Sequence, residues 1–252
     1  MAVYHDKAVE RIKGALRPMV AIINHAKKSN MKEADTRTIT VDVLTEMLGW
    51  GKYEDGSKPY ITAEYAIKGG YADYAIVKKD AKGNKRIYAV IEIKQAGMKL
   101  NDNHFRQARD YAVNEGVKWI VLTNADDWEV YRVAINKRKS QPIPEVLPVF
   151  SVTLSNTDMR PGERAEWLYL LTEEASRKDE LEEWYIKIQA VSPENLAKKI
   201  LSKDVMDRIR LGIKKEIGIN FPNEELAERI AKHVLTDNVV LENMSYYIKR
   251  CT

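Results

Sequence analysis

Two acidic residues and a lysine interrupt stretches of sequence that otherwise have the apolar character of β-strands. Asp73 lies within YADYAIV, Glu92 lies within RIYAVIEI, and Lys94 follows Glu92 by two positions. Because side chains alternate along a strand, Glu92 and Lys94 are expected on the same face. The connection over residues 78–86 is typical of a hairpin loop, so the two strands should bring Asp73 beside Glu92.

Side-by-side carboxylates of this kind favour a bound cation. Two neighbouring negative charges repel each other unless a cation or a proton lies between them. Magnesium prefers carboxylate, water and phosphate oxygens, and it lowers the pKa of a bound water that can attack a phosphodiester. Lys94 could orient that water or hold the phosphate as a point charge. The other interpretation, a structural Glu–Lys pair on a solvated face of the sheet, stays open.

A helix expected over residues 102–114 supplies further polar side chains. Asn103, Gln107 and Tyr111 recur at four-residue spacing and therefore form one stripe on its surface. Gln107 and Tyr111 would face the same end of the sheet as Lys94, where they could bind phosphate or a base edge. A solvated helix face explains the spacing equally well.

Three further residues are weaker candidates. Glu64 lies on the β-type run before Asp73 and could be an additional metal ligand, although a surface position fits its spacing equally well. Glu46 could play the same part from the preceding helix. Arg37 could contact phosphate, and a solvated arginine is the simpler interpretation.

Five segments occur in a fixed order along the chain: Glu64, YADYAI, VIEIKQAG, Gln107-x-x-x-Tyr111 and VLTNADDWEVYRV. This succession resembles the N-terminal nuclease domain of type I restriction enzyme R subunits, within the PD-(D/E)XK superfamily, and it covers residues 33–135. One departure is the absence of a G-x-x-x-x-G-K-[ST] phosphate loop. We therefore expect a nuclease domain that stands alone, without the ATP-driven motor of a full R subunit.

The resemblance implies a site, a cofactor and a fold. Asp73 and Glu92 would be the metal-binding acids, and Lys94 would be a catalytic residue. Gln107 and Tyr111 would complete the catalytic set or contact DNA. The implied metal is Mg²⁺, for which Mn²⁺ should substitute, and the implied partner is DNA. The implied fold class is α/β (α+β): a restriction-endonuclease-like core with a mixed central sheet flanked by helices.

Apolar periodicity predicts elements of both kinds along the chain. Helices are expected over 5–28 and 39–49, followed by β-type runs over 60–67, 71–77, 86–93, 119–125 and 128–135. Pro18 should bend or split the first helix. The pattern after residue 155 is helical, so we predict a restriction-endonuclease-like nuclease domain over 1–155 and a helical C-terminal domain over 156–252.

Composition restricts the class of protein. The single cysteine, Cys251, excludes a disulfide framework within the chain and indicates a reducing compartment. No stretch approaches the ~18–20 apolar residues that span a bilayer, and the charged N-terminal stretch is unlike a signal peptide. A cytoplasmic location and no membrane partner are therefore expected. Residues 1–159 carry a net charge of +5 and residues 160–252 carry −1, so a polyanion should bind the first part.

The leading hypothesis is therefore a metal-dependent deoxyribonuclease that hydrolyses phosphodiester bonds, as an endonuclease in preference to an exonuclease. Cutting both strands requires two active sites, so a homodimer through the helical C-terminal part is also expected. The alternative is a catalytically silent module that keeps the nuclease fold and acts by binding DNA or a protein partner.

Overall fold

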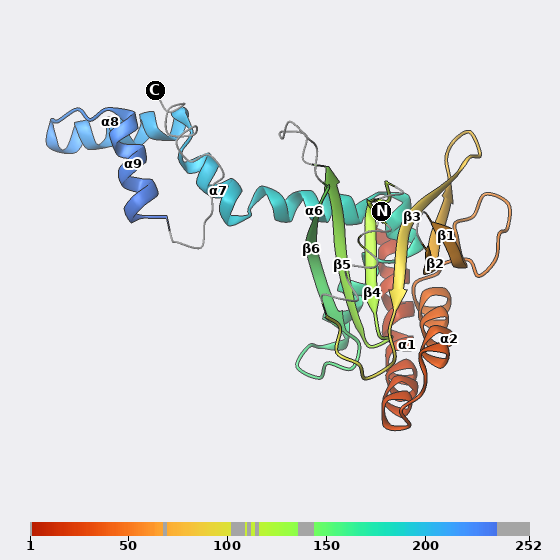
Figure 1. Ribbon diagram of the computed structural model, residues 1–252. Coiled ribbons are helices and arrows are strands. Elements are labelled where there is room, and N and C mark those ends of the chain that lie inside the picture. The colour runs from red at the N-terminus through yellow and green to blue at the C-terminus, as the bar shows by residue number, and fades with distance from the viewer. Residues whose placement is uncertain are drawn as a thin grey trace. The chain divides into compact units, whose positions relative to one another are not determined.

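Six strands form a single mixed sheet in the computed structural model (Figure 1). The structure describes residues 2–67, 70–101, 109, 112–113, 116–135 and 144–235. The strands are β1 (Tyr60–Ile67), β2 (Gly70–Lys79), β3 (Lys85–Ile93), β4 (Trp119–Thr123), β5 (Asp127–Ile135) and β6 (Pro144–Thr153). They follow one another across the sheet in chain order and are antiparallel, except that β3 and β4 run parallel. The predicted mixed sheet is confirmed.

The parallel step from β3 to β4 requires a crossover connection, because a tight turn cannot join two parallel neighbours. A helix is predicted over 102–114 in that connection. Of its residues the structure describes Arg109, Ala112 and Val113, and all three are helical, while the others lie outside the described residues. Ala112 is fully buried in a core cluster on one face of the sheet. This described part of the connection therefore packs on that face.

The sheet is buried on both faces, which explains why its central strands are nearly continuous apolar runs. On one face, Val90 and Ile120 pack in the cluster that contains Ala112. On the other face, Ile91 and the two large rings Trp119 and Trp128 line an apolar interior together with side chains of the helical layer. Val90 and Ile91 thus face opposite sides of the sheet, as the alternation of side chains along a strand requires.

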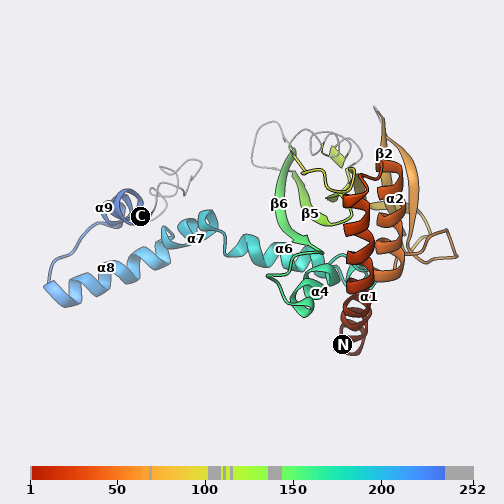
Figure 2. The same ribbon diagram turned by 90° about the horizontal axis from the view of Figure 1, so that it is seen from below.

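The helical layer begins with α1 (Ala2–Lys28), α2 (Glu33–Asp42) and the π-helical turn η1 (Val43–Met47). Figure 2 shows α1 and α2 side by side on one face of the sheet, and α2 contacts β3. The predicted second helix began only at residue 39, whereas α2 begins at Glu33. Its start is stabilised by the Asp35 carboxylate, which accepts the backbone N–H of Lys32 at 3.2 Å.

Pro18 does not split α1, which is continuous from Ala2 to Lys28. The helix presents one buried stripe on both sides of the proline, formed by Ala8, Ile12, Leu16, Met19, Ile23 and Ala26. Burial of each large apolar side chain contributes about 1.5–3 kcal/mol, whereas a proline inside a helix costs about 3 kcal/mol. Packing of the whole stripe therefore outweighs the interruption. Of the two predicted effects of Pro18, the split is wrong and the bend stays a prediction.

Strand β6 was not among the predicted strands, because its prolines are typical of a boundary between domains. Pro144 and Pro148 both lie in β6, which pairs with β5 and is the last strand in the order of the sheet, so that it forms an edge among the described strands. A proline is tolerated on an edge strand, where its missing N–H can point away from the ladder. The β5–β6 register shifts between Val130 and Tyr131, and Tyr131 pairs with Pro148.

The helices after β6, α4 (Pro161–Tyr169) and α5 (Glu173–Arg177), belong to the same compact unit as the sheet. Arg11 of α1 makes a bidentate ion pair with Glu174, with N–O distances of 2.6 and 2.9 Å. The indole N–H of Trp50, which is buried, donates to the carbonyl of Leu171 at 2.9 Å. The chain therefore divides between Glu182 and Glu183, and the boundary predicted near residue 155 lies inside the first unit.

Helix α6 (Glu180–Ala190) begins at the end of the first unit, and the second unit continues with α7 (Pro193–Ile200), α8 (Lys203–Ile217) and α9 (Asn223–His233). Its small core consists of Ala197, Leu201, Met206, Leu226 and Ala227. Ser192 caps α7 by accepting the backbone N–H of Asn195, as the Ser-Pro pair predicts. The predicted helical character of this part is confirmed. Within the described ranges, no helix is long and apolar enough to cross a membrane.

The division of the chain at residue 182 can be tested with fragments. A fragment of residues 1–182 should unfold cooperatively. A fragment of residues 1–155 loses α4 and α5, and with them the Leu171 carbonyl that accepts from Trp50 and the Glu174 carboxylate that pairs with Arg11. We expect the shorter fragment to be destabilised by about 3 kcal/mol or more, or to aggregate. Thermal melts followed by circular dichroism measure this. Equal melting temperatures for the two fragments would contradict the assignment of α4 and α5 to the first unit.

Candidate active site

Asp73 and Glu92 meet where β2 and β3 pair, as the sequence predicts. Tyr74 pairs with Ile91 in the antiparallel register, and continuing that register by one residue places Asp73 across from Glu92. The Oδ2 atom of Asp73 accepts the backbone N–H of Ile93 at 2.7 Å. This hydrogen bond fixes one carboxylate oxygen of Asp73 against the end of β3, beside Glu92.

Lys94 lies against Glu92 and is held there by the sheet. Its Nζ donates to Oε1 of Glu92 at 2.6 Å. Its backbone N–H donates to the carbonyl of Thr123 at 2.8 Å, which extends the pairing of β3 with β4. Glu92 is only 3% exposed, so a charged carboxylate at this position loses nearly all of its hydration. The structure therefore brings Asp73, Glu92 and Lys94 into one cluster.

Helix α2 adds two charged residues to this cluster. Nη2 of Arg37 lies 2.5 Å from Oδ1 of Asp73 and 3.2 Å from Oε1 of Glu33, one helical turn before it. The negative charge of Glu33 acts on both Asp73 and Glu92. From the sequence, Arg37 was a weak candidate and Glu33 was not a candidate. Their four-residue spacing could be seen in the sequence, but their position at the end of the sheet could not, because it depends on how α2 packs.

Burial controls the proton affinity of both acids. Burial raises the pKa of Glu92 to about 7, although the hydrogen bond from Lys94 opposes the rise, and the charge of Asp73 raises the pKa further. Burial also raises the pKa of Asp73, against the opposing effects of the Ile93 N–H and of Arg37. Both carboxylates are thus costly to ionise without an added positive charge, which is common where side chains have a functional task.

The donor set fits a hard divalent cation such as Mg²⁺. The cluster contains three carboxylates, from Glu33, Asp73 and Glu92, against the two cations Arg37 and Lys94. A bound cation would therefore supply the positive charge that is missing. Glu33 acts on the two acids through its charge and is not itself a donor, because no three Asp, Glu, His or Cys side chains in the described part of the chain lie close enough together to hold a metal ion. Asp73 and Glu92 are therefore the two carboxylates that could hold one. Mg²⁺ suits such a place, since it is often held by one or two carboxylates and completes its shell with water and phosphate oxygens.

Glu64, predicted as a further metal ligand, lies in β1 on the neighbouring strand. The β1–β2 register places it across from Asp73, at a point where its backbone is left-handed with φ of 44°. Its side chain is exposed, and its charge acts on Tyr74. A left-handed conformation is uncommon for a residue other than glycine. The role of Glu64 as a ligand stays a prediction.

Two other predicted residues, Gln107 and Tyr111, lie outside the described residues, so their predicted contribution to the site stays a prediction. Glu46 lies in η1 with an exposed side chain. No contact recorded for the described residues joins Glu46 to Asp73 or to Glu92, and the structure gives no support to its proposed part in the site.

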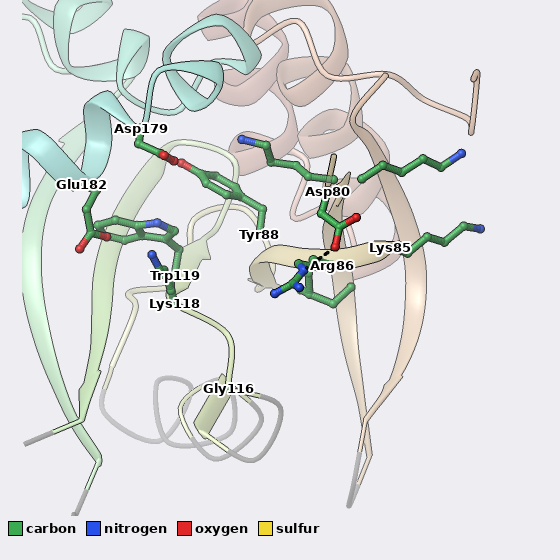
Figure 3. Close-up of a pocket in the computed structure, with 12 residues that line it drawn as sticks. Asp80, Lys85, Arg86, Tyr88, Gly116, Lys118, Trp119, Asp179 and Glu182 are labelled. Carbon is green, nitrogen blue, oxygen red and sulfur yellow. Dashed lines mark hydrogen bonds and ion pairs between the residues drawn. The ribbon is translucent and has the colours of Figure 1, made fainter. Parts of the chain in front are cut away.

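A separate cavity of about 530 Å³ lies at the other ends of β2 and β3 (Figure 3). Its lining is Lys78, Lys79, Asp80, Lys85, Arg86, Ile87, Tyr88, Gly116, Lys118, Trp119, Asp179 and Glu182. Several charged side chains that line this cavity already have partners within the protein. Lys78 donates to the carbonyl of Ser176 at 2.6 Å and lies 4.7 Å from the centre of the Tyr88 ring, and Arg86 pairs with Asp80 at 3.2 Å. None of the predicted site residues lines this cavity.

The part of the chain that contains the Asp73–Glu92 cluster matches a known family. Residues 32–148 match the family model described as the type I restriction enzyme R protein N terminus. The resemblance predicted over 33–135 is confirmed, and the match extends into β6. It implies a nuclease-related function, and it includes Asp73, Glu92 and Lys94. We take the Asp73–Glu92 cluster as the candidate active site because it joins two acids and a lysine at the end of β3, with Glu92 buried.

One solved structure is also similar to the chain. It is the cryo-EM structure of a DrdV–DNA complex, with 16% sequence identity and a TM-score of 0.36. The similarity covers 92% of this chain and 21% of that chain, so this chain spans about a fifth of the length of its structural neighbour. A comparison with curated proteins gives no match.

The raised pKa of Glu92 predicts how stability depends on pH in the metal-free protein. With a folded-state pKa of about 7 and an ordinary value of 4.5, the folded protein holds a proton that the unfolded chain has lost. The free energy of unfolding should therefore fall as the pH rises through this window, by about 1–3 kcal/mol from this group.

Urea unfolding with a chelator present, at about pH 5 and about pH 7.5, measures this fall. The glutamine of the Glu92→Gln variant does not titrate. The free energy of unfolding of this variant should therefore fall less than that of the wild type between the two pH values. The difference between the two proteins isolates Glu92 from other titrating groups. An equal fall in both would show that the pKa of Glu92 is not raised.

Proposed function

We propose that this chain is a metal-dependent nuclease that hydrolyses DNA phosphodiester bonds, as an endonuclease in preference to an exonuclease. The observation that carries the proposal is the pair of buried acids, Asp73 and Glu92, beside Lys94 at the end of β3. The match of residues 32–148 to the restriction enzyme family supports it. DNA is the proposed substrate because of that family and because residues 1–159 carry the positive excess of the chain.

Asp73 and Glu92 would hold the metal, which we propose to be Mg²⁺, with Mn²⁺ as a substitute. When bound, such an ion stabilises the charge that develops on a phosphate and lowers the pKa of a coordinated water. The chain positions the acids in advance. The Ile93 N–H orients the carboxylate of Asp73, and the strand pairing fixes Glu92 opposite it. Because the pKa of Glu92 is about 7, metal binding should release its proton and strengthen as the pH rises through neutrality.

Lys94 would act on the substrate. Its ammonium group is 2.6 Å from Glu92 and its side chain is 13% exposed, so it is partly buried yet reaches the surface of the cluster. A compact charge in this position can hold a non-bridging phosphate oxygen or orient the attacking water. Its link to Thr123 through the backbone limits its movement, which keeps the charge close to the place where the phosphate would lie.

A second candidate function follows from the same contacts. Asp73 is already paired with Arg37, and Glu92 with Lys94, so both acids have a cation from the protein itself. This arrangement also suits a catalytically silent nuclease fold that binds DNA or a protein partner. The second unit exposes apolar side chains, among them Leu196, Leu211 and Ile217, and a homodimer through this unit remains part of our proposal.

Cleavage of supercoiled plasmid and of single-stranded DNA tests the proposal. With Mg²⁺ or Mn²⁺ the wild type should cut, and Asp73→Asn, Glu92→Gln and Lys94→Ala should each slow cutting by about 100-fold or more, because each removes charge at the reacting phosphate. A chelator should abolish cutting by the wild type.

Glu10 and Lys13 provide matched controls, because they form an exposed ion pair on α1 with the same 2.6 Å separation as Lys94 and Glu92. Glu10→Gln and Lys13→Ala should cut at the wild-type rate. If the folded wild type cuts no nucleic acid and binds no metal by calorimetry, the catalytically silent module is the better description.

A further inference from the structure

We propose that Arg37 is an internal counter-ion of Asp73 that the incoming metal displaces, and that the freed guanidinium then binds the phosphate of the substrate. This inference rests on the proposed function and names a residue that acts at the same site. It makes two separable statements: Arg37 competes with the metal for Asp73, and Arg37 contributes to turnover once the metal is bound.

The competition follows from the two oxygens of Asp73. Oδ2 is occupied by the backbone N–H of Ile93 at 2.7 Å, a contact that also keeps β2 and β3 together. The remaining oxygen, Oδ1, is the one left for a metal, and it lies 2.5 Å from Nη2 of Arg37. A metal ion and a guanidinium cannot both approach one oxygen at bonding distance from the same side, because their charges repel. Metal binding at Oδ1 therefore requires Arg37 to withdraw.

Arg37 is poorly satisfied in the position that it occupies. A guanidinium has five N–H donors in a fixed planar fork. The recorded polar contacts of Arg37 within the described residues both use Nη2, to Asp73 and to Glu33. Its Nε is buried and has no hydrogen-bond partner among those residues. An unpaired buried donor is unfavourable, so this orientation has a cost that a ligand with several acceptor oxygens would remove.

A phosphate has the acceptors that this guanidinium lacks. Two of its oxygens can accept parallel hydrogen bonds from the edge of the fork, which makes arginine the preferred partner of phosphate groups. The side chain of Arg37 is 35% exposed, so it already reaches the surface where a DNA backbone would approach. Withdrawal from Asp73 would thus exchange one anionic partner for another.

Glu33 limits how far Arg37 can move. The two residues are four positions apart on α2, and their ion pair does not involve Asp73. When the metal takes Oδ1, the guanidinium can rotate away from Asp73 and stay paired with Glu33. The arginine therefore remains beside the site instead of returning to bulk solvent, and its charge stays available for the substrate.

Calorimetric titration of the full chain with Mn²⁺ alone tests the competition. Arg37→Ala should bind Mn²⁺ about three- to ten-fold more tightly than the wild type, the range expected from removing one partly exposed ion pair. Arg37→Gln should behave in the same way and serves as a second variant if Arg37→Ala does not fold. Arg37→Lys keeps a positive charge and should bind Mn²⁺ like the wild type.

Cleavage at saturating Mn²⁺ tests the phosphate contact. Arg37→Ala and Arg37→Lys should both lose about ten-fold or more in kcat, since lysine lacks the fork that binds two oxygens. Arg229→Ala is the matched control, because Arg229 pairs with Glu225 four residues before it on α9. This control should leave both the Mn²⁺ affinity and kcat unchanged.

Unchanged or weaker Mn²⁺ binding by a folded Arg37→Ala or Arg37→Gln variant would overturn the competition, and full kcat in Arg37→Lys would overturn the phosphate contact. These outcomes differ from failure of the proposed function. If the wild type binds Mn²⁺ and cuts no DNA, the nuclease proposal fails while the affinities of the variants still decide the competition. If neither the wild type nor Arg37→Ala binds Mn²⁺, both proposals are wrong.

Discussion

The rest of the site depends on the burial of Glu92 at the end of an apolar strand. A carboxylate that is 3% exposed loses its hydration, and an isolated charge in such a place is strongly unfavourable. The structure offsets this in two ways: Lys94 donates to the carboxylate, and the raised pKa allows a proton to neutralise it. The charge of the neighbouring Asp73 adds to the cost of ionising Glu92, and we propose that a divalent cation shared by the two acids would remove that cost.

The sheet and its acids could be predicted because the information is local in the sequence. Short apolar runs mark β2 and β3, and the short connection between them favours antiparallel pairing. From that pairing alone, Asp73 must lie near Glu92, and Lys94 must follow two residues later on the same face. Only the details came from the structure, such as the hydrogen bond from Ile93 to Asp73 and the pairing of Lys94 with Glu92.

The contribution of α2 could not be predicted in the same way, because it depends on contacts between residues far apart in the chain. Arg37 and Asp73 are separated by a π-helical turn, a loop and the whole of β1. Residues 33–38, EADTRT, show no apolar repeat of helical spacing, and this hid the true start of the helix. Strand β6 was not predicted because it contains prolines, and a proline is compatible with a strand only where the strand lies at an edge of the sheet.

The extent of the first unit could not be predicted because nothing in the helical sequences of α4 and α5 shows which unit they pack against.

The order of the strands has a consequence for how the site assembles during folding. The turn between β2 and β3 closes a short loop, whereas α2 must approach from more than thirty residues away, and longer closures have a larger entropic cost. Loop closure alone therefore favours contact between the two acids over contact between Asp73 and the guanidinium of Arg37. We expect the charge cluster to be completed only when the helical layer docks on the sheet, so that its formation would report on that docking.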